Sequence, residues 1–110
     1  PQKEPVYSES VSKAIRYISS NYQRHDLSRQ DIAAHVFLSE KYLSSLFARE
    51  TGTHLIAYIN QYRIQKAIDL LKQTRLPVSE IAFKVGYSSV QNFNKNFKSV
   101  TATSPSHYRA

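Results

Sequence analysis

The chain matches itself when it is shifted by about 50 residues. With a shift of 49, Leu27, Ile32, Ala33, Val36 and Ser39 fall on Leu76, Ile81, Ala82, Val85 and Ser88. With one more residue in the turn, Leu43, Phe47, Thr51, Thr53 and Tyr58 fall on Phe93, Phe97, Thr101, Thr103 and Tyr108. Because there are two copies and not a longer series, the sequence predicts a duplicated unit rather than a solenoid.

Each copy has the pattern of a short helix, a tight turn and a longer helix. Ser28, followed three residues later by Asp31, resembles a capping box that starts the first short helix. Ala33 and Ala82 are small at the point where the two helices of each unit must cross closely. This is the layout of a helix-turn-helix, which we expect over about 28–52 and again over about 77–101.

Apolar residues at helical spacing predict further helices outside the two copies. We expect a first amphipathic helix over about 9–22, a linker helix over about 54–73 that joins the two units, and a last helical turn from Ser104-Pro105. No convincing strand appears, so the predicted fold is all-α with about seven helices. Residues 1–8 contain two prolines and no periodicity, which indicates a tail or interdomain linker before one domain over 9–110.

The charge balance favours a polyanionic partner. Fifteen Lys and Arg residues stand against eight Asp and Glu, a net charge of +7. Every acid lies at or before Glu80, whereas Lys84, Lys95, Lys98 and Arg109 follow it. A basic chain with such a segment is typical of a nucleic-acid-binding protein.

Composition also excludes several classes of protein. There is no cysteine, and therefore no disulfide, thiol nucleophile or Cys-ligated zinc. No apolar run approaches the roughly 20 residues of a membrane span, and no signal peptide opens the chain. We therefore expect a cytoplasmic protein that does not act on membranes.

The stretch GYSSVQNFNKNF, residues 86–97, predicts a helix with an unusual outer face. Its inner positions are Val90, Phe93 and Phe97, which leave Gln91, Asn94, Lys95 and Lys98 pointing outward. Gln and Asn can form two hydrogen bonds with adenine, and Lys can reach guanine. The alternative is an ordinary solvated polar face.

The repeat, the long helix between its copies, and the segment IAFKVGYSSVQNFNKNFKSVTATSPSHYR resemble the DNA-binding domain of the AraC/XylS family of bacterial transcription regulators. The resemblance covers about residues 11–109. Two positions depart from it: Phe37 stands where the family usually has glycine, and Ala102 where the repeat's own Gly52 predicts glycine. The resemblance implies two homeodomain-like units, sequence-specific binding of double-stranded DNA, RNA polymerase as a partner, and no cofactor.

We expect base contacts from both units. In the second unit they are assigned to the helix face just described, and in the first unit the resemblance places them at the start of its longer helix. The base-contact residues are Lys41, Ser44, Ser45, Val90, Gln91, Asn94 and Lys95. The expected backbone contacts are Ser39, Arg49, Lys84, Ser88, Ser89 and Lys98. Because serines carry little sequence information, the first unit should discriminate less than the second.

The length of the linker helix suits two adjacent grooves. About 20 residues at ~1.5 Å each span ~30 Å, close to the ~34 Å of one DNA turn. A monomer of the domain would then read a bipartite, non-palindromic site in successive major grooves, with some bending of the DNA. The family resemblance and the proline-containing start indicate a C-terminal piece of a larger regulator. A receiver or sugar-binding module would precede it, and a full-length dimer would form through that module.

The sequence has two other interpretations. An enzyme is not predicted, because His25, His35, His54 and His107 form no metal-binding pattern and no glycine-rich phosphate loop is present. A helical module that docks on a transcription partner is the alternative to DNA binding. Arg63 lies in the apolar arc of the linker helix, so we expect a structural role, paired with Asp31 or Glu80.

Overall fold

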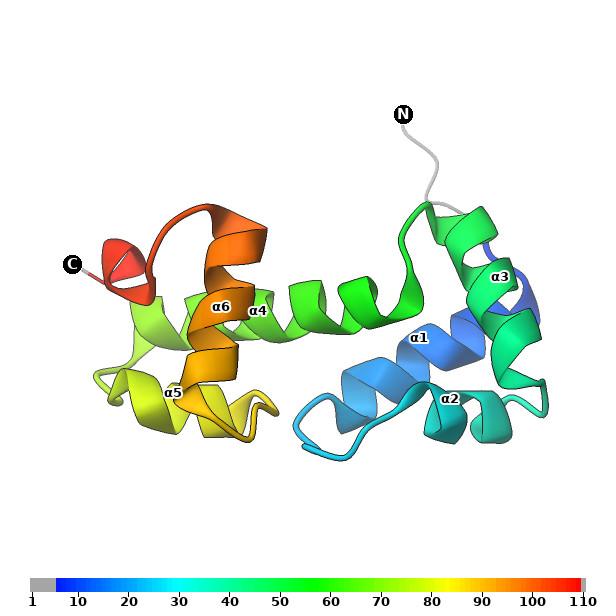
Figure 1. Ribbon diagram of the computed structural model, residues 1–110, viewed down its shortest axis with the longest axis horizontal. Coiled ribbons are helices and arrows are strands. Elements are labelled where there is room, and N and C mark those ends of the chain that lie inside the picture. The colour runs from blue at the N-terminus through cyan, green and yellow to red at the C-terminus, as the bar shows by residue number, and fades with distance from the viewer. Residues whose placement is uncertain (1–5, 110) are drawn as a thin grey trace.

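A computed structural model describes residues 6–109, and this part of the chain is entirely helical (Figure 1). It contains six α-helices and one 3-10 helix and no strand, which confirms the all-α fold. Residues 1–5 of the expected tail lie outside the described residues. The elements are α1 (Glu9–Asn21), α2 (Arg29–His35), α3 (Glu40–Thr51), α4 (Leu55–Gln73), α5 (Val78–Lys84), α6 (Val90–Thr101) and η1 (Pro105–Tyr108).

Serine side chains start the helices of both units. The capping box of α2 is confirmed: Ser28 Oγ accepts the Asp31 N–H at 3.2 Å, and the Asp31 carboxylate accepts the Ser28 N–H at 3.3 Å. Ser39 caps α3 by accepting the N–H of Tyr42 at 3.1 Å. Its equivalent at α6 is Ser89, which accepts the N–H of Asn92 at the same distance. The extra residue of the second unit therefore lies in the turn before Ser89.

The two turns between paired helices share the same backbone hydrogen bond and a residue with positive φ. The N–H of Leu38 donates to Ala33 O at 3.0 Å, as the N–H of Tyr87 does to Ala82 O. Just before these residues the backbone is left-handed, with φ of 60° at Phe37 and 109° at Gly86. Phe37 thus adopts the conformation for which its family usually has glycine, although an L side chain costs about 1–2 kcal/mol there.

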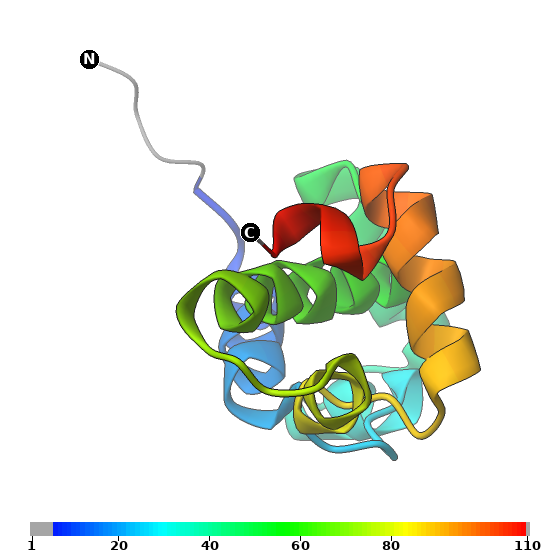
Figure 2. The same cartoon turned by 90° about the vertical axis from the view of Figure 1, so that its left-hand side faces the viewer.

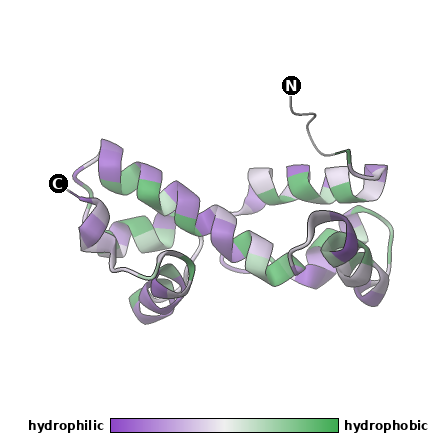
Figure 3. Cartoon of the chain, turned by 90° about the horizontal axis from the view of Figure 1, so that it is seen from above, coloured by the Kyte–Doolittle hydropathy of each residue, from purple (hydrophilic) through white to green (hydrophobic). Residues whose placement is uncertain are grey.

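The helices bury two hydrophobic cores, and α4 belongs to both. Its first half packs with α1, α2 and α3, and its second half with α5, α6 and η1 (Figures 1 and 2). The apolar stripes that face these cores are green in Figure 3. The buried residues Val11, Ala14 and Ile18 of α1 have the spacing of Ile64, Ala67 and Leu71 of α4. The duplication therefore includes the helix that precedes each helix-turn-helix.

Arg63 lies where α4 passes from one core to the other, and it joins the two units. Its side chain is only 8% exposed. Nε donates to Tyr22 O at 2.9 Å and Nη2 to Arg24 O at 2.8 Å, while the guanidinium lies 5.4 Å from the centre of the Tyr87 ring. Burial lowers the pKa of Arg63 below its ordinary value.

The predicted pairing of Arg63 with Asp31 or Glu80 is wrong. Asp31 is occupied by its capping box and by Arg24, at 3.4 Å. The partners of Arg63 are instead backbone carbonyls in the loop after α1, where the chain has left its helix and its carbonyls need donors. Gly86 makes this close approach feasible, because a Cβ there would lie 2.6 Å from Arg63 Nε.

Candidate nucleic-acid interface

Helix α6 is held by two phenylalanines and presents polar side chains on its outer side. Phe93 and Phe97 are fully buried and make edge-to-face contacts with Tyr87 and Tyr108 of the second core, respectively. This anchoring determines which residues point outward. Gln91, Asn94, Lys95 and Lys98 are all exposed, and Val90 is half-buried at the first turn.

The start of α6 and the end of α5 add donors and positive charge. Ser88 is exposed, whereas the hydroxyl of Ser89 accepts the helix-capping hydrogen bond and lies half-buried. Lys84 is the exposed last residue of α5. Within residues 6–109, neither Lys84, Lys95 nor Lys98 makes an ion pair. Their charge is therefore available to an anionic partner.

Helix α3 presents a similar but less polar surface. Lys41, Ser45 and Arg49 are exposed and Ser44 is half-buried, while Ser39 is exposed at the cap. The two acids of α3 have partners: Glu40 pairs with Arg29 at 3.4 Å, and Glu50 accepts the Ser8 N–H at 2.7 Å.

One side chain on α3 was not predicted. Tyr42 is half exposed beside Lys41, at the position that Asn92 holds in α6. A helical wheel of α3 places Tyr42 on the exposed side, so the sequence could have identified it. Within the described residues, Lys41 and Arg49 make no ion pair, so α3 also presents unpaired positive charge.

Helix α3 lies beyond the N-terminal end of α4, α6 crosses α4 further along, and the two helices run in similar directions (Figure 1). Helix α4 has 19 residues, which at ~1.5 Å each is about 28 Å. The whole described part measures 40 × 38 × 21 Å and is therefore flat. A flat molecule that carries two separate exposed polar helices of similar direction can face a long, regular polyanion with both.

A cavity of about 360 Å³ lies between α4 and α6, and the sequence did not indicate it. Asn60 and Arg63 line it from α4, and Asn92, Lys95 and Asn96 from α6. The two α6 asparagines lie one turn apart, so a helical wheel places them together. Asn60 is distant in the chain, and no local pattern marks it.

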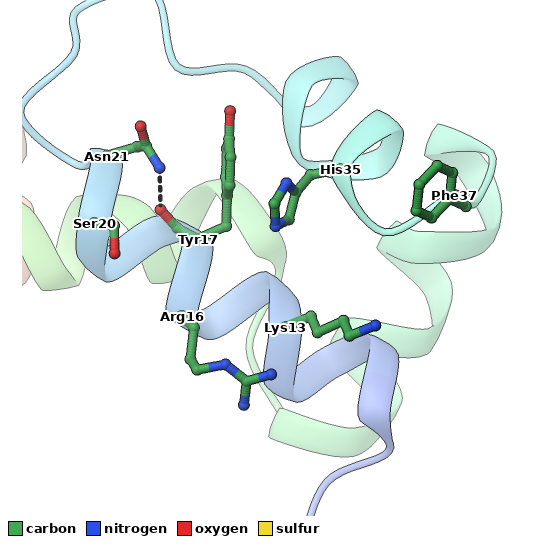
Figure 4. A pocket seen from close by; sticks show the side chains of 7 residues that line it. All are labelled: Lys13, Arg16, Tyr17, Ser20, Asn21, His35 and Phe37. Carbon is green, nitrogen blue, oxygen red and sulfur yellow. Dashed lines mark hydrogen bonds between the residues drawn. The ribbon is translucent and has the colours of Figure 1, made fainter.

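A second groove follows α1 and the turn after α2 (Figure 4). Tyr17 stacks on His35 with ring centres 4.2 Å apart, and Phe37 is 91% exposed at its edge. Of its two cations, Lys13 is paired with Glu9 at 3.2 Å. None of its residues belongs to α3 or α6, so the predicted base contacts lie elsewhere.

No group of three or more His, Cys, Asp or Glu side chains is placed to hold a metal ion within residues 6–109. None of the helices in this range is both long and apolar enough to cross a membrane.

Known proteins resemble this chain over nearly its whole length. A family model described as "Helix-turn-helix domain" matches residues 32–110. The arabinose operon regulatory protein of Escherichia coli is 33% identical over 96% of this chain, and the match covers 36% of that protein. The chain also spans 35% of a helix-turn-helix transcriptional regulator of Bacillus subtilis that is 33% identical. It therefore covers about a third of the length of these relatives.

Solved structures agree with the fold. The C-terminal domain of AraT, a response regulator from Geobacillus stearothermophilus, superposes with a TM-score of 0.90 at 35% identity. That match covers 93% of this chain and 84% of the other. The C-terminal domain of the response regulator yesN from Fusobacterium nucleatum gives a TM-score of 0.88 at 30% identity, with 94% and 100% covered.

Proposed function

Because the chain belongs to the AraC/XylS family of helix-turn-helix transcription regulators, we propose that it binds a particular double-stranded DNA sequence through α3 and α6. Each helix enters one of two successive major grooves, and the site is bipartite and non-palindromic. The observation that carries this proposal is the exposed face of α6, which has amides and lysines and no acid. Amides and lysines suit the hydrogen-bonding edges of bases.

In this proposal the second unit discriminates between base sequences more strongly than the first. Gln91, Asn94 and Lys95 read bases from α6, with Val90 against a thymine methyl group. Lys41, Ser44 and Ser45 contact bases from α3, with weaker discrimination. The remaining predicted residues hold the phosphate backbone and position both helices: Ser39, Arg49, Lys84, Ser88, Ser89 and Lys98.

The wider function follows from DNA binding. The domain acts as a monomer on its site, in the bacterial cytoplasm, and contacts RNA polymerase there. It is a binding module and not an enzyme, and it forms the DNA-binding part of a larger regulator whose other module forms any dimer. A module that only docks on proteins is not favoured, because the family match is to DNA-binding regulators.

The test separates residues that read bases from residues that hold phosphates. The preferred site is first selected from random DNA, and single-base variants of it are then measured across a salt series. Gln91→Ala or Asn94→Ala should cost ~1–3 kcal/mol at one or two base pairs. Lys98→Ala should weaken binding to all variants and reduce the slope of log affinity against log salt by ~0.9.

The effects of these substitutions on base preference and on the salt slope show which residues contact bases and which contact phosphates. Lys95→Ala removes both a base contact and a charge, so it should change both quantities. If Gln91→Ala and Asn94→Ala weaken every DNA variant equally, α6 holds DNA without reading it. If selection from random DNA enriches no sequence at all, the proposal of sequence-specific binding is wrong.

A further inference from the structure

The cavity between α4 and α6 is lined by hydrogen-bond donors. Asn60 and Arg63 come from α4, Tyr87 from the turn, and Asn92 and Lys95 from α6. No carboxylate is among the residues that line it. A cavity with two cationic side chains and no acid favours an anion.

Hydrogen bonds within the cavity wall use the side-chain oxygens of Asn60 and Asn92 and leave the amide donors of these two residues unused. Tyr87 OH donates to Asn60 Oδ1 at 2.9 Å, and burial raises the pKa of Tyr87 to about 12, which keeps this hydroxyl protonated. Asn96 Nδ2 donates to Asn92 Oδ1 at 3.0 Å and to Asn92 O at 2.9 Å. Both acceptor oxygens are therefore occupied, and the Nδ2 groups of Asn60 and Asn92 remain as donors. Asn96 orients Asn92, and its own Oδ1 accepts no hydrogen bond from within residues 6–109.

Arg63 supplies a buried charge at the same cavity. Two of its three nitrogens bind the carbonyls of Tyr22 and Arg24, and Nη1 has no protein partner within residues 6–109. In this part of the chain no fully buried side-chain nitrogen lacks a partner, so Nη1 keeps some exposed surface, and Arg63 is one of the residues that line the cavity. An arginine more than nine-tenths buried, with one donor left over, is prepared for a charge-assisted hydrogen bond.

From these contacts we propose that the cavity is a binding site for one phosphate-type oxyanion. Arg63 Nη1 and the Nδ2 groups of Asn60 and Asn92 donate to its oxygens, and Lys95 adds charge from α6. Two sources share this chemistry: a phosphate of the DNA backbone beside α6, and a free phosphate compound. Only the DNA source rests on the proposed function.

The first arm of the test uses inorganic phosphate without DNA. The side-chain amide NMR signals of Asn60 and Asn92 should shift with phosphate in a saturable way, and those of Gln61 should not. Asn60→Asp keeps the oxygen that accepts from Tyr87 but replaces the donor with a negative charge. It should weaken phosphate binding at least about tenfold. The control is Gln61→Glu, the same change of charge at the exposed neighbour on α4, which should change binding less than twofold.

The second arm uses the selected DNA site in a salt series. If the anion is a DNA phosphate, Asn60→Asp should reduce the salt slope by about one phosphate contact, ~0.9, and Gln61→Glu should not. One neutral methylphosphonate should then weaken the wild type but not Asn60→Asp. If both variants bind DNA alike while phosphate alone still requires Asn60, the site takes a free anion.

The proposal is overturned if phosphate moves none of the cavity signals, or if the two variants lower phosphate affinity equally. Sequence-specific DNA binding could persist in either case, because Gln91 and Asn94 are not part of the cavity. If the wild-type chain binds phosphate in the cavity but binds all DNA sequences equally well, the proposed function is contradicted and the phosphate site is not.

Discussion

Replacing Gly86 with alanine tests how the two units are joined, and Gly52 is a matched control. Both glycines have left-handed backbone, with φ of 109° and 78°. An L residue in that region costs about 1–2 kcal/mol at either position. The surroundings differ: a Cβ at Gly52 would meet nothing within 4 Å, whereas one at Gly86 would lie 2.6 Å from Arg63 Nε and overlap the carbonyl oxygen of Tyr22.

The structure therefore predicts two different losses of stability. Gly52→Ala should lower the free energy of unfolding by about 1–2 kcal/mol, the backbone cost alone. Gly86→Ala should also break the hydrogen bond from Arg63 Nε to Tyr22 O, and bonds of a charged group contribute about 1.5–3 kcal/mol. We expect a total loss of about 2.5–5 kcal/mol.

Urea unfolding of the chain, followed by far-UV circular dichroism, measures both losses. An additional loss of about 1.5–3 kcal/mol for Gly86→Ala relative to Gly52→Ala is the expected result. Equal losses would mean that the contact of Arg63 with the loop after α1 does not stabilise the fold, and the account of how the units are joined would be refuted.

Three further predictions concern other positions. Ala102→Gly should raise the free energy of unfolding by up to about 1 kcal/mol, because Ala102 has a φ of 65°; an unchanged or lower urea midpoint would contradict this. The pKa of Tyr87 lies near 12 in the folded chain and near ~10 when unfolded, so the unfolded state loses its proton first and stability falls as pH rises from ~10 to ~12. In Tyr87→Phe, the decrease in the free energy of unfolding between pH ~10 and ~12 should be smaller than in the wild type by roughly 2–3 kcal/mol. If urea unfolding shows the same decrease in both proteins, the phenol of Tyr87 is not buried. Lys41→Ala should weaken DNA binding with a salt-slope change of ~0.9 and little change in base preference, whereas a large change in preference would show that α3 discriminates as strongly as α6.

The fold was predictable because the sequence pattern of a helix-turn-helix occurs twice in the chain. The 50-residue match, the capping box at Ser28 and the buried spacing of Phe93 and Phe97 are local patterns, and each one specifies a helix or its start. The outer faces of α3 and α6 follow from the same periodicity. Even the departure at Phe37 left the turn intact, since its hydrogen bonds come from the backbone.

The contacts of Arg63 were not predictable, for a physical reason. A helical wheel shows that an arginine is buried. From the sequence, the partner to expect for a buried positive charge is an acidic side chain. In the structure the donors go to two carbonyls of a loop about 40 residues earlier in the chain, and such a partner leaves no mark in side-chain composition. The orientation of Asn60 is equally non-local, because it depends on a hydroxyl from another unit.

Footprinting on the selected DNA site tests the central claim most directly. With α3 and α6 in successive major grooves, guanine N7 methylation should be blocked in two clusters on one face of the DNA, about one helical turn apart. Substitutions on α6, such as Gln91→Ala, should weaken protection in one cluster, and Lys41→Ala should weaken it in the other. A single protected cluster, or two clusters that both respond to the same helix, would contradict the account.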